Sequence, residues 1–473
     1  MKIIGREKEQ NILSNLFESN KPEFLVVYGR RRVGKTYLIK EFFNNSFSFY
    51  TTGIKTKTKR DKLNTFHRSL LEYGNNDKKQ PADWFEAFSR LEKLLKSDNI
   101  KTFGQNKRKI VFLDELPWMD SPKSNFKEAL DLFWNKYGSS DEKLLLIVCG
   151  SATSWIVDNI LSNRGGFYNR ITRKLHLSPF TLKECEELLN DNRISFSRRQ
   201  IIETYMVFGG VPYYLSLLNS RLSLAQNIDE LCFNENGELF YEYNNLFASL
   251  FNNHVNHMTI IELLAEYRDG LARKEIEAKT KISGKSLTTT LNELEQCGFI
   301  RKYQQYDKLI NGGVFQLIDP FTLFAITYIK NRKVSSWINY IDTGSYNNWA
   351  GHAFEMVCFN HLNEIKKVLG IEGVITNEYS YRSKKNKDGA QIDLIIDRKD
   401  ETINLCEMKF CEVPYSIDEQ YNKKLLNKKN VFKEETKTKK SIYITMITSS
   451  GLIDNSYAKD ITNSVNVEEE LFI

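Results

Sequence analysis

Near its beginning the chain reads Gly29-Arg30-Arg31-Arg32-Val33-Gly34-Lys35-Thr36. This stretch matches the pattern G-x-x-x-x-G-K-[ST]. Residues 24–28 before it are apolar and predict a buried strand, and residues 37–43 after it carry apolar side chains at helical spacing. A strand, a glycine-rich turn and a helix in this order are the context in which the pattern forms a phosphate loop. The stretch therefore predicts a phosphate loop, and the alternation of apolar strands and amphipathic helices over residues 1–180 predicts an α/β fold with a doubly wound parallel sheet.

The residue types of this stretch suit the binding of a nucleoside triphosphate. Gly29 and Gly34 let the backbone fold closely around a phosphate, and the N-terminus of the following helix adds partial positive charge. We expect Lys35 to bind the β- and γ-phosphates of ATP and Thr36 to bind Mg²⁺. Every residue from 29 to 36 is expected to contact the nucleotide. The alternative interpretation is a glycine-rich turn that matches the pattern by chance.

A second motif lies at residues 110–115, where four apolar residues precede Asp114 and Glu115. The run predicts a strand buried on both faces, and its carboxylates are expected at the sheet edge where ligands bind. We expect Asp114 to hold Mg²⁺ through water and Glu115 to orient the attacking water. The pair therefore predicts hydrolysis as well as binding of ATP, whereas the alternative is a pair of acids that merely begin a loop.

Three further polar residues are candidates for sensing the γ-phosphate. Ser151 follows the apolar strand predicted at residues 144–149, and Arg164 and Arg170 lie on either side of a Gly-Gly turn. One of the arginines could act as an arginine finger in this subunit or in a neighbouring one. A finger supplied by a neighbour would favour a homo-oligomer, and plain surface arginines are the alternative.

The composition sets limits on the class of protein. A chain of 473 residues with 41% hydrophobic content supports two to four packed domains, and its net charge of +7 permits a nucleic-acid partner without requiring one. No apolar run approaches the about 20 residues that span a bilayer, so no membrane partner is expected. The beginning of the chain has no apolar signal core and the seven cysteines are scattered. These features predict a cytoplasmic protein.

Changes in pattern along the chain predict four domains. Residues 1–180 alternate strands and helices and form the predicted ATPase core, residues 181–254 a helical lid, residues 255–344 a winged helix-turn-helix with a connector, and residues 345–473 a small α/β domain. A lysine-rich stretch at residues 423–440 predicts an amphipathic helix inside the last domain.

The predicted winged helix-turn-helix rests on three helices and two strands. The helices are expected at residues 260–265, at residues 271–279, and from a cap at Ser283 to Glu295, and the strands at residues 300–304 and 313–317. The third helix would expose a polar face that could enter a DNA major groove, made of Lys285, Ser286, Thr288, Thr289 and Asn292. Because the segment is only weakly basic, docking to a protein remains the alternative.

Carboxylates gather near the end of the chain. Residues 391–396 and 402–410 predict a β-hairpin whose turn near residue 400 places Asp393 opposite Glu407, and Glu407 on one face with Lys409. Glu355 lies on a helix that opens at residues 349–355. Two carboxylates and a lysine at a sheet edge suit metal-dependent phosphodiester cleavage.

Four motifs together resemble the archaeal and bacterial ATPase family that is related to the AAA+ and STAND groups. They are the phosphate loop, the Asp114-Glu115 pair, the start Ile-Gly-Arg-Glu-Lys-Glu at residues 4–9, and Gly-Gly-Val-Pro-Tyr-Tyr at residues 209–214. This resemblance implies that Arg6 lies near the nucleotide base and that Pro212 packs against adenine from the helical lid. From its own neighbours, Pro212 is only a turn proline.

The C-terminal acids resemble the PD-(D/E)XK nuclease superfamily, which has a restriction-endonuclease-like fold. The resemblance implies that Glu355, Asp393 and Glu407 hold Mg²⁺, that Lys409 assists catalysis, and that DNA is the substrate. The domain order looks like that of bacterial and archaeal proteins whose C-terminal part was long described as a domain of unknown function. Gln391 stands where relatives often have Glu, so a degenerate nuclease fold remains open.

The motifs support three functional hypotheses. The first is an ATPase that controls a Mg²⁺-dependent DNA nuclease. The second is an ATP-dependent regulator or scaffold that binds DNA or protein and whose nuclease fold is inactive. The third is an ATPase that remodels proteins and does not respond to DNA.

Overall fold

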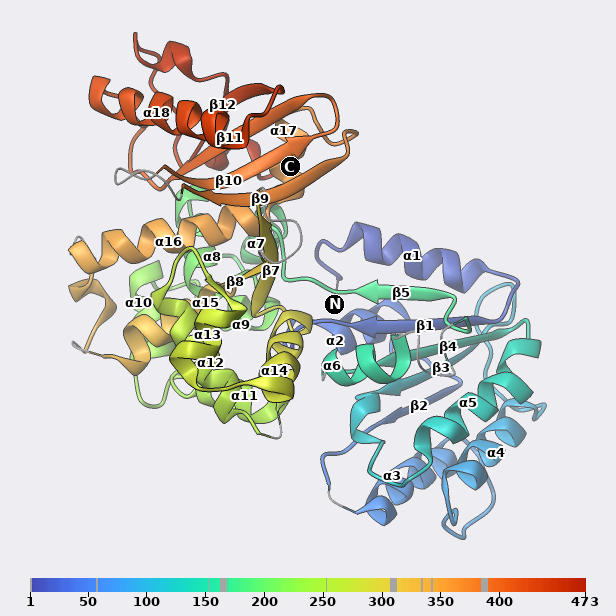
Figure 1. The fold of residues 1–473 in the computed structure, drawn as a ribbon. Helices are drawn as coiled ribbons and strands as arrows, with labels where there is room; N and C mark the ends of the chain where they lie inside the picture. The colour runs from blue at the N-terminus through green and yellow to red at the C-terminus, as the bar shows by residue number, and fades with distance from the viewer. Residues whose placement is uncertain are drawn as a thin grey trace. The chain divides into compact units, whose positions relative to one another are not determined.

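The computed structural model describes residues 2–56, 58–151, 153–161, 167, 169–251, 253–306, 313–332, 335–341, 343–383 and 390–473 (Figure 1). The chain divides into two compact units, residues 1–178 and 179–473. Among the described residues, no helix combines the length and the apolar character that crossing a bilayer requires.

The first unit is built on a five-stranded sheet in the order β2-β3-β4-β1-β5. Every neighbouring pair of these strands is parallel. The strands are β1 (Glu23–Tyr28), β2 (Phe49–Thr52), β3 (Lys109–Asp114), β4 (Leu144–Cys149) and β5 (Arg173–His176). The predicted parallel sheet is therefore confirmed.

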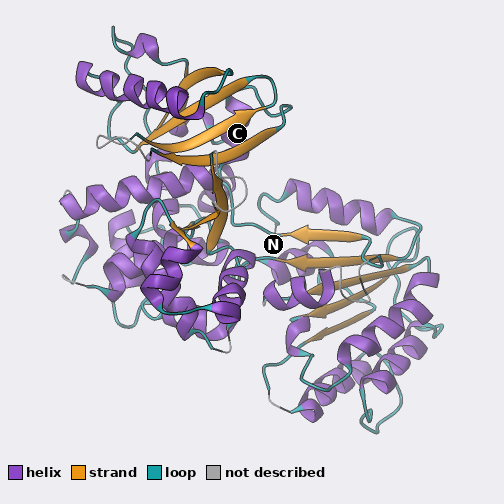
Figure 2. Ribbon diagram, in the orientation of Figure 1, coloured by secondary structure: helices purple, strands orange, loops and turns teal. Residues whose placement is uncertain are grey.

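Helices cover both faces of this sheet (Figure 2). Phe24 and Val26 of β1 pack into a core with helices α3, α4 and α5, whereas Leu25 and Val27 pack into a second core with α1 and α2. This alternation is the period of two expected for a strand buried on both faces. The helices are α1 (Glu7–Glu18), α2 (Lys35–Phe42), α3 (Lys59–Glu72), α4 (Trp84–Leu95), α5 (Phe126–Lys136) and the short α6 (Thr153–Ile156). The unit is doubly wound, as expected.

The second unit begins with helices, as the lid prediction expected. They are α7 (Leu182–Asp191), α8 (Arg198–Phe208), α9 (Pro212–Ser216), α10 (Leu224–Ile228) and α11 (Glu242–Leu250). Gly209 ends α8 with a φ of 70°, and a Cβ on Gly210 would lie 2.4 Å from the carbonyl oxygen of Phe180. The Gly-Gly pair therefore permits a tight break that larger residues would obstruct. Pro212 follows at the first turn of α9, where proline costs no hydrogen bond.

Three helices and a small antiparallel sheet come next. The helices are α12 (Val255–Glu266), α13 (Arg273–Thr280) and α14 (Gly284–Gln296), and the strands are β6 (Leu271–Ala272), β7 (Ile300–Gln305) and β8 (Gly313–Leu317). Two expectations need correction. Residues 271–272 pair with β8, so the second helix begins at Arg273, and Ser283 occupies the cap position of α14 without a side-chain capping hydrogen bond. The five polar side chains expected on the outer face of α14 are all exposed.

The last part of the chain forms the remainder of an eight-stranded sheet in the order β13-β12-β11-β10-β9-β7-β8-β6. Its strands are β9 (Thr376–Arg382), β10 (Gln391–Arg398), β11 (Thr402–Lys409), β12 (Ser441–Thr448) and β13 (Asn463–Asn466). The predicted hairpin of β10 and β11 is confirmed. Because β7 pairs with β9, the hairpin β7–β8 continues this sheet. The three segments predicted after residue 180, namely the lid, the winged helix-turn-helix and the C-terminal domain, all lie in the second unit.

Two long helices cover opposite faces of the C-terminal sheet. Leu394 and Cys406 pack with α16 (Gly344–Asn360), and Ile395 and Leu405 pack with α18 (Glu419–Thr436). The helix α18 confirms the prediction for the lysine-rich stretch. Two shorter helices complete this part, α17 (Leu362–Val368) and α19 (Val467–Glu470). Between β8 and α16 lie α15 (Pro320–Phe324) and short turns of helix up to residue 339.

Candidate functional site

The phosphate-loop stretch connects β1 to α2 at the carboxyl end of the parallel sheet. Gly29 has a φ of 142°, and a Cβ there would lie 2.2 Å from the carbonyl oxygen of Leu177. Gly34, with a φ of 89°, stands at the cap position of α2. Both glycines therefore adopt backbone conformations that other residues rarely take, which explains their places in the motif.

Lys35 folds back into the loop that precedes it. Its side chain is buried, and its Nζ donates hydrogen bonds to the carbonyl oxygens of Gly29 at 2.9 Å and Arg30 at 2.7 Å. The ammonium group that would donate to phosphate oxygens thus donates to carbonyl oxygens of its own loop. The loop therefore holds its lysine close to the position that phosphate binding requires.

Thr36 and Asp114 meet although 78 residues separate them in the chain. The Thr36 Oγ1 lies 3.0 Å from both carboxylate oxygens of Asp114, because β3 ends beside the start of α2. Burial raises the pKa of Asp114, and the neighbouring Glu115 carboxylate adds to that rise. A hydroxyl and a carboxylate are the oxygen ligands that Mg²⁺ prefers, so these two residues fit the expected metal.

Glu115 points toward the end of the neighbouring strand β4. Its carboxylate accepts hydrogen bonds from the Ser151 hydroxyl at 2.7 Å and from the Ser151 backbone N–H at 3.3 Å. The Glu115 backbone has a φ of 47°, a left-handed conformation that is uncommon for a residue with a side chain. The structure thus joins two residues that the sequence had placed on separate motifs, while the sensing role of Ser151 stays a prediction.

Two more side chains support the loop. Arg6 is buried and donates from Nη2 to the carbonyl oxygens of Val33 at 3.3 Å and Ser178 at 2.7 Å. The Thr153 hydroxyl donates to the Gly29 carbonyl oxygen at 3.0 Å. Arg6 therefore lies beside the phosphate loop, and its place near the nucleotide base, which the resemblance implied, stays a prediction. Thr153 escaped the sequence analysis because no motif marks it.

The structure describes one of the two candidate arginine fingers. Arg170 forms an ion pair with Asp131 of α5, and Arg164 lies outside the described residues. Pro212 belongs to the second unit, so its predicted packing against adenine stays a prediction.

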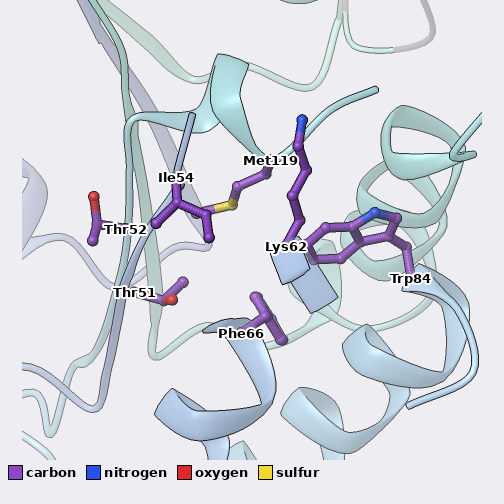
Figure 3. Close-up of a pocket in the computed structure, with 8 residues that line it drawn as sticks. Thr51, Thr52, Ile54, Lys62, Phe66, Trp84 and Met119 are labelled. Carbon is purple, nitrogen blue, oxygen red and sulfur yellow. The ribbon is translucent and has the colours of Figure 1, made fainter. Parts of the chain in front are cut away.

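A narrow recess lies near the end of β2 (Figure 3). Ile54, Phe66, Trp84 and Met119 give it a largely apolar lining, and Lys62 borders it. The Lys62 ammonium group donates to the carbonyl oxygen of Asp120, and burial lowers the pKa of this lysine. None of the predicted nucleotide-binding residues lines the recess, so it is distinct from the phosphate loop.

The second candidate site lies on the hairpin β10–β11. The pairing of β10 with β11 runs from Asp397–Ile403 to Leu394–Cys406 and ends there, so Asp393 and Glu407 stand one position beyond the last paired residues. The register between β10 and β9 shifts between Ile392 and Ile395, which places Asp393 in a β-bulge. A bulge redirects a side chain, and the Asp393 carboxylate turns back to accept a hydrogen bond from the Met408 N–H at 3.0 Å.

Glu407 and Lys409 lie on the face of the sheet that α18 covers. The Glu407 carboxylate pairs with the Lys428 ammonium group and lies 3.4 Å from the Tyr421 hydroxyl. The Lys409 Nζ lies 5.2 Å from the centre of the Tyr421 ring. Burial and the nearby Asp393 carboxylate raise the pKa of Glu407 to about 7.

Glu355 lies on the other face, where α16 covers the sheet. Arg268, from the turn between α12 and β6, donates to both Glu355 carboxylate oxygens, from Nε at 2.6 Å and from Nη2. Burial and the Asp393 carboxylate raise the pKa of Glu355 to about 8. Close by, the Gln391 amide donates to the Asp269 carboxylate, whose pKa burial also raises.

The predicted metal ligands are therefore divided between two faces of the sheet. Asp393 lies within electrostatic reach of both Glu355 and Glu407, but those two acids lie on opposite faces and are paired with Arg268 and Lys428 respectively. In the part of the chain that the structure describes, no three acid, histidine or cysteine side chains are gathered so that they could hold a metal ion. The oxygen donors suit Mg²⁺ by type, while their present pairing occupies them.

Comparisons with known proteins address the N-terminal part. Residues 3–218 match the family described as an ATPase domain predominantly from Archaea. This part of the chain is an archaeal-type ATPase domain. The match covers residues 3–178 of the first unit and continues past α9, so it includes the Gly-Gly-Val-Pro-Tyr-Tyr motif.

Similar proteins are known from archaea. An uncharacterized protein of Methanocaldococcus jannaschii is 25% identical over 77% of this chain and 78% of its own length. An uncharacterized ATP-binding protein of the same organism is 22% identical over 49% of this chain and 74% of its own length. A solved Walker-type ATPase of Pyrococcus abyssi is 19% identical, with 69% of this chain and 96% of that one covered and a TM-score of 0.48.

We expect Glu115→Gln to leave ATP bound to the ATPase domain and to slow hydrolysis by at least about 100-fold, because the amide cannot accept a proton from water. Nucleotide binding measured by fluorescence and phosphate release measured in the same samples check this result. Glu128→Gln is the matched control, because Glu128 is an exposed acid of α5. Normal hydrolysis by Glu115→Gln would show that another group orients the water.

Proposed function

We propose that this protein is an ATP-driven switch whose ATPase domain binds and hydrolyses ATP with Mg²⁺ and controls a Mg²⁺-dependent DNA nuclease in its C-terminal segment. The observation that carries the ATPase part is the 3.0 Å contact of Thr36 with both oxygens of Asp114, beside the Lys35 loop. The ATP-binding relative from M. jannaschii supports ATP as the nucleotide.

Each residue of the nucleotide site has its own role in the proposed hydrolysis of ATP. Lys35 exchanges the Gly29 and Arg30 carbonyl oxygens for phosphate oxygens, and the backbone N–H groups of the loop surround the β-phosphate. Thr36 and Asp114 would hold Mg²⁺, which when bound neutralises phosphate charge. Glu115 leaves Ser151 and accepts a proton from the attacking water.

The nuclease part of the proposal rests on the hairpin. Asp393 and Glu407 stand one position beyond the last paired residues of β10 and β11, and Lys409 follows on the same face as Glu407. These are the residues that would hold Mg²⁺ and orient water on a phosphodiester. Glu355 would contribute from the other face. In this proposal the C-terminal segment is a restriction-endonuclease-like domain, and α16 and α18 are the helices that flank its sheet.

The proposed contact with DNA is assigned to the three-helix segment, which consists of α12, α13 and α14 with strands β6 to β8. The order α12, β6, α13, α14, β7, β8 agrees with a winged helix-turn-helix, and α14 exposes Lys285 together with four hydroxyl or amide side chains. Such a helix fits a major groove, with the lysine near phosphate. Binding and hydrolysis of ATP would reposition this segment and thereby control access to the acids.

A second candidate function is an ATP-dependent regulator or scaffold whose nuclease fold is inactive. The pairing of Glu355 with Arg268 and of Glu407 with Lys428 favours it, because neutralised acids are poor metal ligands. In this case the three-helix segment binds DNA or protein and the C-terminal sheet only supports it.

One experiment separates the two functions. ATP hydrolysis and cleavage of labelled linear and supercoiled DNA are followed during a Mg²⁺ titration for the wild type, Lys35→Ala and Asp393→Ala. We expect Asp393→Ala to keep the ATPase activity and to lose DNA cleavage down to the level of a blank. Asp454→Ala, an exposed acid near the end of the chain, is the control. ATP hydrolysis without cleavage by the wild type, even with Mn²⁺, would favour the regulator or scaffold.

A further inference from the structure

Lysines are concentrated on one helix near the end of the chain. Residues 423–440, which cover most of α18 and the connection to β12, carry eight lysines and two glutamates. The rest of residues 345–473 carries ten basic and eighteen acidic residues. The C-terminal segment as a whole is therefore slightly acidic, while this one stretch is strongly basic. Such a separation of charge creates a local positive potential that attracts anions.

Part of this positive charge is neutralised inside the segment. Three of the eight lysines have an acidic partner, in the ion pairs Lys423–Glu419, Lys428–Glu407 and Lys440–Asp397. The other five form no ion pair with another residue that the structure describes, and they are Lys424, Lys429, Lys433, Lys437 and Lys439. The stretch therefore keeps an excess of positive charge after its internal pairs are formed.

Three of these five lysines are neighbours on the helix surface. Lys429, Lys433 and Lys437 follow one another at intervals of four residues, which is about 6 Å along a helix axis. We call these three residues the lysine stripe. Lys433 and Lys437 are exposed, and Lys429 is half-buried.

The lysine stripe has a cost in helix stability, because like charges four residues apart repel one another. Lys433 lies in the last turn of α18 and Lys437 at its C-cap, where the helix dipole favours positive charge. This effect falls off within one turn, so it does not extend to Lys429. An anion bound along the stripe would remove the repulsion between all three ammonium groups.

The apolar side chains of α18 are already buried. Val431 and Phe432 pack in a core with residues of β10 and β11, and Leu425 packs in another with residues of β12. The helix therefore has no apolar face left to insert into a lipid surface. A row of regularly spaced ammonium groups matches instead the row of phosphates along a nucleic-acid backbone.

We propose that the lysine stripe of α18 binds the phosphate backbone of a nucleic acid without regard to its sequence. Lysine is a compact point charge that suits contact with single phosphates, and phosphate contacts position a nucleic acid without reading its bases. Lys428, the neighbour of Lys429, joins the same helix to Glu407, so a backbone on the stripe would run past the hairpin that carries the acids. The inference rests on the proposed function for nucleic acid as the partner, and it does not require cleavage.

The test measures binding of the full chain to a fluorescein-labelled DNA duplex by fluorescence anisotropy, without divalent metal, over a series of salt concentrations. Each lysine–phosphate contact contributes about 0.9 to the slope of log K against log salt. We expect glutamine at all three stripe positions (Lys429→Gln, Lys433→Gln and Lys437→Gln) to lower this slope by about 2 to 3 and to weaken binding at low salt at least about tenfold. Arginine at the same three positions keeps the charge and is expected to keep the slope.

The matched control removes three exposed lysines from the first unit, with the changes Lys8→Gln, Lys101→Gln and Lys143→Gln, and is expected to keep the wild-type slope. Circular dichroism checks that each variant is folded. If the triple stripe variant is not folded, the single change Lys433→Gln decides in its place, with an expected loss of about 1 in slope.

An unchanged slope in the folded stripe variant, or equal losses in this variant and its control, would overturn the inference. Loss of binding to phosphatidylserine vesicles with unchanged DNA binding would also overturn it, in favour of a membrane surface as the partner. If the stripe variant loses slope and the wild type does not cleave DNA with Mg²⁺, the inference stands and the nuclease function fails. If the wild type cleaves DNA and the stripe variant keeps the slope, the nuclease stands and the inference fails.

Discussion

Lys35→Ala is expected to lower ATP hydrolysis by at least about 100-fold, because it removes the one ammonium group that the phosphate loop already surrounds. The Lys35 side chain is buried, and its Nζ donates to two backbone carbonyl oxygens within the loop. An incoming triphosphate therefore finds a cation that is positioned before it binds, so little ordering is needed at the moment of reaction.

The matched control for this change is Lys40→Ala on the same helix. The Lys40 Nζ lies 4.4 Å from the centre of the Tyr50 ring, so it belongs to the far end of α2 and not to the loop. Steady-state phosphate release and equilibrium binding of a fluorescent ATP analogue, measured side by side, check the expectation. Hydrolysis at more than a tenth of the wild-type rate in folded Lys35→Ala would contradict the assigned phosphate loop.

Arg108→Met is expected to destabilise the ATPase domain by about 3 kcal/mol or more, since it leaves buried carbonyl groups without donors. Arg108 is 0% exposed. Its guanidinium donates to four backbone oxygens at 2.7 to 3.1 Å, which belong to Ser19, Lys21, Glu142 and Leu144. It therefore ties the connection before β1 and the connection before β4 to the start of β3.

Urea unfolding followed by tryptophan fluorescence checks this value. Lys143→Met is the control, because Lys143 is exposed beside the same connection and its replacement should cost less than about 0.5 kcal/mol. Equal unfolding midpoints for the two variants would show that water or a shift of the backbone satisfies the four carbonyl groups.

Local pattern and strand order together predicted much of the first unit. The apolar runs at residues 24–28, 110–113 and 144–149 are β1, β3 and β4, and the phosphate-loop stretch lies between β1 and α2 as expected. These elements are predictable because a strand buried on both faces needs a continuous apolar run. The phosphate loop is predictable because it needs backbone conformations with positive φ, which glycine adopts readily. Arg108 was not predictable, since its four acceptors come from separate parts of the chain.

The hairpin shows where prediction from pattern ends. Simple alternation predicted Asp393 opposite Glu407, whereas the paired residues of the two strands end one position earlier, at Leu394 and Cys406. Alternation could not reveal the bulge at Asp393, because the extra residue arises from pairing with β9. Nor could it show that Glu355 and Glu407 are separated by the sheet, which depends on which helix covers each face.

The sequence by itself determined the doubly wound parallel sheet, the phosphate loop and the identity of the acids, because each depends on residues that are neighbours in the chain or that repeat with the period of a strand or helix. Only the tertiary structure decided the partners of those acids. Arg268 reaches Glu355 across 87 residues, and Lys428 reaches Glu407 from a different helix. Electrostatic pairing acts through space between segments that folding brings together, so no local pattern records it.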